Sequence, residues 1–257
     1  MVLTVNVTNT NITIGVFNEE NKLVMVAKTV TDKTKSEEEY AQIFSDLCAN
    51  KNIKSGDIEG SILSCVVAQL SATIDEAIHI FTGKNAMKIE AGVKTGLPIK
   101  ADNPSEIGSD IVVGAVGAVS RYKKPIVVVA LNTATVFTVI NDQGALVGVS
   151  IAPGVRISAE ALSMRASQLP YVALEAPARV IGRNTAECMK SGIMHGAASM
   201  IDGMIDRIEA ELGSNATVVI TGPLAKRITP LCKVPAHIDE FLQLEGMNSI
   251  YRKNADK

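Results

Sequence analysis

Short apolar runs and polar turns alternate over residues 2–30, a pattern that predicts three consecutive β-strands. The runs cover residues 2–8, 12–18 and 22–30 and are rich in Val, Ile and Thr, which favour extended backbone. The segment Asn18-Glu19-Glu20-Asn21 separates the second run from the third and is typical of a hairpin turn. We therefore expect three hairpin-linked strands at the start of the chain.

Helices and a further strand follow this first group of strands. Ser36 and Glu39 have the spacing of a capping box, which predicts a helix over residues 36–48. Residues 62–67 are a short apolar run typical of a buried strand, and residues 71–82 predict a second helix.

The same order of elements begins again at residue 125. Three more strands are predicted over residues 125–130, 134–141 and 145–152, followed by helices at about 154–168 and 182–212 and by a strand at 218–220. Two rounds of three strands followed by helices indicate an internal duplication. We expect an α/β protein with two lobes, residues 1–115 and 116–257, joined within a Gly/Ala-rich helix and binding a ligand in the cleft between them.

Composition narrows the classes of function. The 257 residues include 25 Lys and Arg against 27 Asp and Glu, and this near balance argues against a nucleic-acid-binding surface. Hydrophobic residues make up 47% and aromatic residues only 4%, as in an α/β protein whose buried strands are built from Val and Ile. We see no signal-peptide-like segment, no apolar run long enough for a bilayer and no CxxC pair. We therefore expect a cytoplasmic protein with reduced thiols and no membrane partner.

Two strand-to-turn segments, residues 5–11 and 129–135, look like one phosphate-binding device used twice. A strand that runs into a tight turn rich in Thr and Asn offers backbone N–H groups and hydroxyls to phosphate oxygens. A divalent metal beside the phosphates usually needs a carboxylate, but the two corresponding strand positions hold Asn6 and Ala130. Ordinary turn chemistry also explains the residue types. It does not explain why they return after the first strand of the second round.

Further short motifs carry a family resemblance. They include Lys94-Thr95-Gly96, Gly108-Ser109-Asp110 and Gly182-Arg183-Asn184-Thr185. From residue 2 to about residue 253, their order and spacing closely resemble the type III pantothenate kinases. The resemblance implies the actin-like/hexokinase-like superfamily fold with two ribonuclease-H-like lobes, and a homodimer that builds the pantothenate site at its interface. It also implies ATP, Mg²⁺ and a monovalent cation (K⁺ or NH₄⁺) for transfer of the γ-phosphoryl group to pantothenate, the opening step of coenzyme A synthesis.

The resemblance also assigns site residues. Asp110 matches the carboxylate that takes the proton of the pantothenate hydroxyl, although an Asp here would equally cap a helix. A second interpretation also stands for Lys94, that of a solvated surface charge. The nucleotide- and phosphate-binding positions are Asn6, Thr8, Asn9, Thr10, Asn11, Thr133, Ala134, Thr135 and Gly222. The substrate-binding positions are Lys94, Thr95, Gly96, Gly108, Ser109, Asp110 and Thr185.

The chain departs from the family pattern at positions that face ligands. The family's Asp-x-Gly-Asn-Thr reads Asn6-Val7-Thr8-Asn9-Thr10 here, and its Asp-x-Gly-Thr-Ala reads Ala130-Leu131-Asn132-Thr133-Ala134. Neither Asn6 nor Ala130 supplies charge to hold Mg²⁺. A Gly-Gly pair near the nucleotide reads Gly222-Pro223, and Pro removes an N–H that could face the ligand.

Three functions fit these observations. The first is a catalytically silent relative, a pseudokinase that still dimerises and holds pantothenate, a related molecule or a nucleotide, either as a homodimer or as a mixed dimer with an intact paralogue. The second is an active pantothenate kinase. The third is phosphoryl transfer to another small hydroxylated substrate, since Ile111 and Ala101 replace an Arg and an aromatic residue near the acceptor. The combined changes favour the first.

Overall fold

The computed structural model describes residues 1–90 and 92–255, which form two compact units. Unit 1 contains Met1–Leu97, Asp102–Ser120 and the C-terminal segment from Leu242, and unit 2 contains Pro98–Ala101 and Arg121–Phe241. The predicted boundary between residues 115 and 116 falls inside helix α3 (Ser109–Arg121), which is continuous through that point. Residues 91, 256 and 257, which the predicted lobes include, lie outside the described residues.

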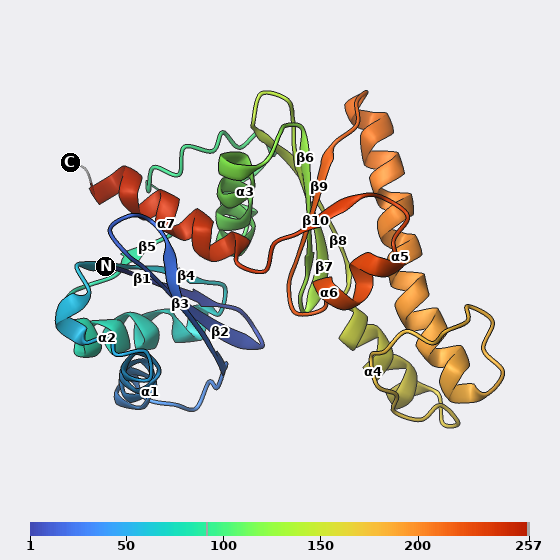
Figure 1. Ribbon diagram of the computed structural model, residues 1–257, viewed down its shortest axis with the longest axis horizontal. Helices are drawn as coiled ribbons and strands as arrows, with labels where there is room; N and C mark the ends of the chain where they lie inside the picture. Colours follow the sequence, from blue (N-terminus) through green and yellow to red (C-terminus); the bar gives the residue numbers. More distant parts are fainter. Residues whose placement is uncertain (91, 256–257) are drawn as a thin grey trace. The chain divides into compact units, whose positions relative to one another are not determined.

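Unit 1 is built on a five-stranded mixed sheet (Figure 1). The three hairpin-linked strands predicted first are β1 (Val2–Val7), β2 (Asn11–Phe17) and β3 (Leu23–Val30), and each pairs antiparallel with the next. Two strands parallel to β1, namely β4 (Gly60–Cys65) and β5 (Met87–Lys88), extend the sheet beyond it. The resulting order is β3-β2-β1-β4-β5.

Helices α1 (Glu37–Ala49) and α2 (Ser71–Thr82) share one buried apolar cluster with the sheet of unit 1. The predicted capping box opens α1, because Ser36 Oγ accepts the Glu39 N–H and the Ser36 N–H donates to the Glu39 carboxylate. A third helix, α7 (Leu242–Ala255), was not predicted and packs against β1, β2 and β4. The C-terminal residues therefore complete the N-terminal unit.

Unit 2 repeats the same sheet. Its strands are β6 (Ile126–Leu131), β7 (Ala134–Ile140), β8 (Leu146–Pro153), β9 (Thr217–Thr221) and β10 (Ala236–Ile238). They lie in the order β10-β9-β6-β7-β8, with antiparallel pairing on the β7 side of β6 and parallel pairing on the β9 side. This is the topology of unit 1, so the predicted duplication is confirmed.

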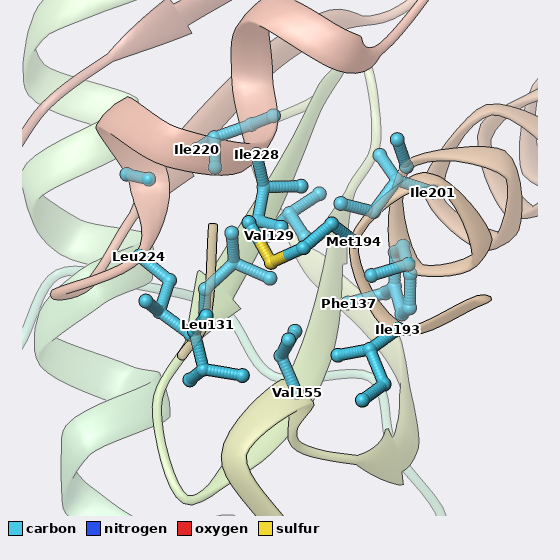
Figure 2. Packing of buried hydrophobic residues seen from close by; sticks show 14 of the residues in the cluster. Val129, Leu131, Phe137, Val155, Ile193, Met194, Ile201, Ile220, Leu224 and Ile228 are labelled. Carbon is cyan, nitrogen blue, oxygen red and sulfur yellow. The ribbon is translucent and has the colours of Figure 1, made fainter. Parts of the chain in front are cut away.

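The helices of unit 2 are α4 (Val155–Arg165), α5 (Thr185–Leu212) and the short α6 (Ala225–Ile228). Helix α4 ends three residues before the predicted limit, and α5 begins three residues later than predicted, after its N-cap Asn184. Figure 2 shows the core between sheet and helix, where Val129 and Phe137 face Met194 and Ile201 of α5.

Four single turns of 3₁₀ helix complete the described chain. They are η1 (Ser55–Asp57), η2 (Ala68–Leu70), η3 (Pro104–Glu106) and η4 (Thr229–Leu231). None of the helices described for this chain combines the length and apolar character needed to cross a membrane.

Candidate functional site

Asn6 lies near the C-terminal end of β1, the central strand of the unit 1 sheet. It pairs with Thr13 of β2 on one side and with Ser64 of β4 on the other. Asn6 is only 6% exposed, and within the described residues its Oδ1 has no hydrogen-bond partner. A buried acceptor left unpaired costs about 1–3 kcal/mol. This oxygen is therefore available to a donor that arrives with a ligand.

The first predicted phosphate turn, between β1 and β2, is closed by its own side chain. Thr8 Oγ1 donates to the Asn11 carbonyl at 2.8 Å and accepts the Asn11 N–H at 3.2 Å, and the Thr31 hydroxyl donates to the Thr8 carbonyl at 2.7 Å. Thr8 does not have a positive φ, so this backbone does not require the family's Gly. The turn thus leaves Asn9 and Thr10 exposed at its tip, while the Thr8 hydroxyl is committed to holding the turn together.

Asp110 occupies the first turn of α3. Burial raises the pKa of its carboxyl, and the N–H groups of Ile111 and of Asp110 itself partly oppose that rise. A Cβ at position 108 would lie 2.7 Å from Asp110 Oδ1, so Gly108 leaves the room in which the carboxylate sits. A carboxyl with a raised pKa suits a general base, and its place at the start of a helix also suits a cap. The geometry of Asp110 therefore fits both a proton acceptor and a helix cap.

A hydrogen bond that was not predicted connects the β-sheet of unit 1 to the turn that carries Asp110. Ser64 Oγ of β4 donates to Ser109 Oγ, the first residue of α3, at 3.0 Å. Since Ser64 is also the register partner of Asn6, the structure brings Asn6, Ser109 and Asp110 to one end of this sheet. In the sequence, Ser64 could have been singled out because it is a polar residue within the apolar run 62–67.

The loop containing Lys94, Thr95 and Gly96 is held elsewhere in unit 1. The side-chain amide of Asn254, in the last turn of α7, donates to the Lys94 carbonyl at 3.1 Å and accepts the Lys94 N–H at 3.4 Å. Thr95 and Gly96 line a cavity of about 120 Å³ with residues from the second half of α3, including Val116. At about 1.5 Å per residue, Val116 lies roughly 9 Å along the helix from Asp110. Thr95 and Gly96 therefore lie against the second half of α3, whereas Asp110 lies in its first turn.

The second predicted phosphate turn joins β6 to β7 in unit 2. Its carbonyls are closely packed: a Cβ at Gly154 would overlap the Thr133 carbonyl oxygen, and a Cβ at Gly222 would lie 2.6 Å from the Leu131 carbonyl oxygen. Gly222 also has a φ of +100°, a conformation that favours Gly. The structure thus brings Gly222 to the turn of Asn132 and Thr133. Ala134 and Thr135 follow as the first residues of β7, where Thr135 is fully buried and its hydroxyl donates to the Pro153 carbonyl at 3.5 Å.

Two other predicted positions, Ala130 and Thr185, lie on elements outside this turn. Ala130 precedes it on β6 and pairs with Thr221 of β9 and Val136 of β7. Thr185 begins α5 on another element of unit 2, behind Asn184, whose side chain accepts the Glu187 N–H at 3.0 Å.

The residues at the family's two acidic positions do not fit a protein-bound Mg²⁺. Mg²⁺ is usually held through carboxylates, whereas Asn6 offers one amide oxygen and Ala130 offers no ligand atom. Across residues 1–90 and 92–255, no group of three or more His, Cys, Asp and Glu side chains could bind a metal ion.

Comparison with known proteins adds to this geometry. The family model for type III pantothenate kinase matches residues 2–207. The type III pantothenate kinase of Citrifermentans bemidjiense is 37% identical over 254 residues, which cover 99% of this chain and 100% of the relative. That of Halalkalibacterium halodurans is 39% identical over 254 residues, with the same coverage.

Among solved structures, component A of the (R)-2-hydroxyglutaryl-CoA dehydratase from Acidaminococcus fermentans has a TM-score of 0.59 at 14% identity, covering 100% of this chain and 99% of that one. The activator of the 2-hydroxyisocaproyl-CoA dehydratase from Clostridium difficile, solved with bound ADPNP, has a TM-score of 0.58 at 10% identity. The match covers 97% of this chain and 93% of that one. At these identities the likeness concerns the fold alone. It confirms the predicted actin-like fold, with two mixed sheets flanked by helices.

Proposed function

Because the chain belongs to the type III pantothenate kinase family, we propose that it retains a frame for pantothenate or a nucleotide in which phosphoryl transfer is impaired or lost. The observation that carries the proposal is Asn6. A neutral amide stands at the family's first acidic position, it is buried, and its oxygen has no partner among the described residues. At the family's second acidic position, Ala130 likewise offers no carboxylate.

The expected size of the defect follows from the chemistry of kinases. Phosphoryl transfer depends mainly on positioning and on electrostatic stabilisation of the transferring group by metal ions and polar groups. Losing one such contact costs about 10²–10³ in rate. Two losses need not add, but together they would leave little turnover with ATP, Mg²⁺ and K⁺ or NH₄⁺.

Binding groups remain in the chain, and they support a retained ligand. Thr133 remains at the second turn, where Gly222 lies close by, Thr135 follows it as a buried residue of β7, and Asp110 remains at the start of α3. In this proposal the turn at Asn132 and Thr133 contacts phosphate oxygens and Asp110 contacts the hydroxyl of pantothenate. ATP and pantothenate are accordingly the two ligands to test.

A homodimer is part of the proposal, and exposed apolar side chains of unit 2 support it. Met164 on α4 is 72% exposed, Tyr171 is 74% exposed and Ile181 is 83% exposed. Ile151, Ile157, Leu162 and Val180 are exposed in the same stretch of chain. Exposed apolar side chains mark an interaction surface where they form a contiguous patch, and we propose that these residues form one that contacts a second copy of the chain.

The dimer is tested by light scattering coupled to size exclusion. The double variant Met164→Asp with Ile181→Asp should elute as a monomer, while Val24→Asp, which alters an exposed apolar residue on β3, should remain a dimer. A wild-type protein that is monomeric at micromolar concentration would contradict this part of the proposal. Recovery of a mixed species with a co-expressed intact paralogue would support the mixed dimer instead.

Ligand binding and catalysis are tested separately. Isothermal titration calorimetry with pantothenate, and with ATP with and without Mg²⁺, should give heat with at least one of them. Heat from neither would contradict retained binding and leave only a structural or partner-binding role. Steady-state turnover at ordinary kinase rates, about 1–100 s⁻¹, would contradict impaired catalysis.

An active pantothenate kinase is the second candidate, and Asp110 favours it. The carboxyl that the family resemblance assigns to proton transfer is retained, and burial raises its pKa. The free Asn6 Oδ1 could also accept a hydrogen bond from water around a cation. The same turnover assay decides between the two candidates.

A further inference from the structure

Ser64 is a buried hydroxyl with a specific partner. It lies on β4, is fully buried, and donates to Ser109 Oγ at 3.0 Å across 45 residues of sequence. Ser61 on the same strand is also buried, but its hydroxyl has no partner within the part of the chain that the structure describes. The two buried hydroxyls of β4 therefore differ, because that of Ser64 joins the strand to the start of α3 and that of Ser61 makes no described bond.

That bond ends at the turn that carries Asp110. The Gly108 carbonyl accepts the N–H groups of Ile111 at 3.0 Å and Val112 at 3.1 Å, so these contacts form the first turn of α3. Gly108 also sits directly against the Asp110 carboxylate. The position of the carboxylate thus depends on where this turn rests on the sheet.

The bond also connects the two halves of the candidate site in unit 1. Ser64 and Asn6 are register partners on neighbouring parallel strands, and such partners point to the same face of a sheet. Ser64 therefore lies between the strand position that the family uses for charge and the helix turn that holds Asp110.

We propose that Ser64 is a positioning residue, whose hydroxyl holds the first turn of α3 on the end of the sheet so that the half-buried Asp110 carboxylate keeps its position. This rests on the proposed function in that Asp110 is taken as the group that contacts the acceptor hydroxyl. A displacement of about 1 Å in such a group can cost about 10²-fold in rate, so a bond that fixes the turn has a direct use.

The test compares Ser64→Ala with Ser109→Ala, which cuts the same bond from its other end, and with the double variant. Ser61→Ala is the matched control, because it removes a buried hydroxyl from the same strand without removing a bond. The ¹³C resonance of the Asp110 carboxyl, assigned by its loss in Asp110→Asn, is followed through a pH titration. Amide exchange of Ile111 and Val112 is measured on the same samples.

Ser64→Ala should lower the pKa of Asp110 toward the ordinary Asp value, because a loosened turn admits water to the carboxylate. Exchange at Ile111 and Val112 should rise about fivefold, the population change equivalent to one net hydrogen bond. Ser109→Ala should reproduce both effects, the double variant should add nothing to either single variant, and Ser61→Ala should leave both readouts unchanged.

Three results would overturn the proposal: an Asp110 titration unchanged in Ser64→Ala or Ser109→Ala, an equal change in Ser61→Ala, or additive effects in the double variant. If Ser64→Ala does not fold, the half-buried Ser109→Ala supplies the same comparison. None of these readouts requires turnover or a bound ligand. A failure here is therefore distinct from a failure of the proposed function, which would appear as absent binding heat or as full kinase activity.

Discussion

Thr8 offers a sharp test of how the chain tolerates a β-branched residue where its family has Gly. Its hydroxyl makes two hydrogen bonds with the backbone of Asn11, one as donor at 2.8 Å and one as acceptor at 3.2 Å. Thr8→Val keeps the size and the branching of the side chain and removes only the hydroxyl. The variant therefore isolates these two bonds.

The expected cost follows from the environment of the turn. Each hydrogen bond contributes about 0.5–1.5 kcal/mol net, so Thr8→Val should lower the free energy of unfolding by about 1–3 kcal/mol. The partial exposure of Thr8 and Asn11 lets water satisfy some of the freed groups, which places the expectation in the lower half of that range. Thr8→Ser, which keeps the hydroxyl, should lose less than about 1 kcal/mol.

The assay is urea unfolding followed by circular dichroism, with the slope against urea checked for each variant. An unchanged slope with a lower midpoint for Thr8→Val is the expected result. If Thr8→Val lost less than about 0.5 kcal/mol, or no more than Thr8→Ser, the turn would not depend on the hydroxyl and our account of why Gly is dispensable there would be wrong.

Three further substitutions test the contact between α3 and α7, the burial of Asp110 and the surroundings of Asn6. Gly246→Ala should destabilise by about 3 kcal/mol or more in urea unfolding, because its Cβ would overlap the Val113 carbonyl oxygen in the contact between α3 and α7, whereas Gly114→Ala, with 3.9 Å to its nearest neighbour, should not destabilise. Burial raises the folded-state pKa of Asp110, so the folded protein binds more protons between about pH 4 and that raised value and loses stability as pH rises through this window. Asp110→Asn should therefore gain stability relative to wild type between pH 4 and pH 7, and a constant difference would contradict the buried carboxyl. Asn6→Asp should lower the thermal midpoint of the unliganded protein, since it buries a charge without a partner. Addition of Mg²⁺ and a nucleotide should restore that midpoint. If neither the substitution nor the addition changed the midpoint, position 6 would not face the ligand.

Local patterns in the sequence predicted most of the strands and helices because their signals are short-range. The alternation over residues 2–30 gave the antiparallel strands, and Ser36 with Glu39 gave the start of α1. Helix α7 was missed because it completes a unit whose sheet ends at Lys88, far earlier in the chain than Leu242, where α7 begins. Strands β5 and β10, of two and three residues, are too short to carry a periodic signal.

The candidate site was predicted in part. The identities of Asn6, Thr133 and Asp110 could be read from motifs, and the structure brings Asn6 and Asp110 to one end of the unit 1 sheet through Ser64 and Ser109. The unpaired Asn6 oxygen could not be predicted, because it depends on which groups of distant segments come within reach. The place of Lys94 is a similar case, since a side chain 160 residues later holds that loop.

The proposed function requires that the neutral residues Asn6 and Ala130 disable phosphoryl transfer in a frame that still binds its ligand. The most direct measurement is steady-state turnover with ATP, pantothenate, Mg²⁺ and K⁺, for the wild type and for the double variant Asn6→Asp with Ala130→Asp. We predict a wild-type rate well below about 1 s⁻¹, the lower end for kinases, and an increase of about 10²-fold or more in the double variant. Wild-type turnover of about 1–100 s⁻¹ would contradict the proposed function.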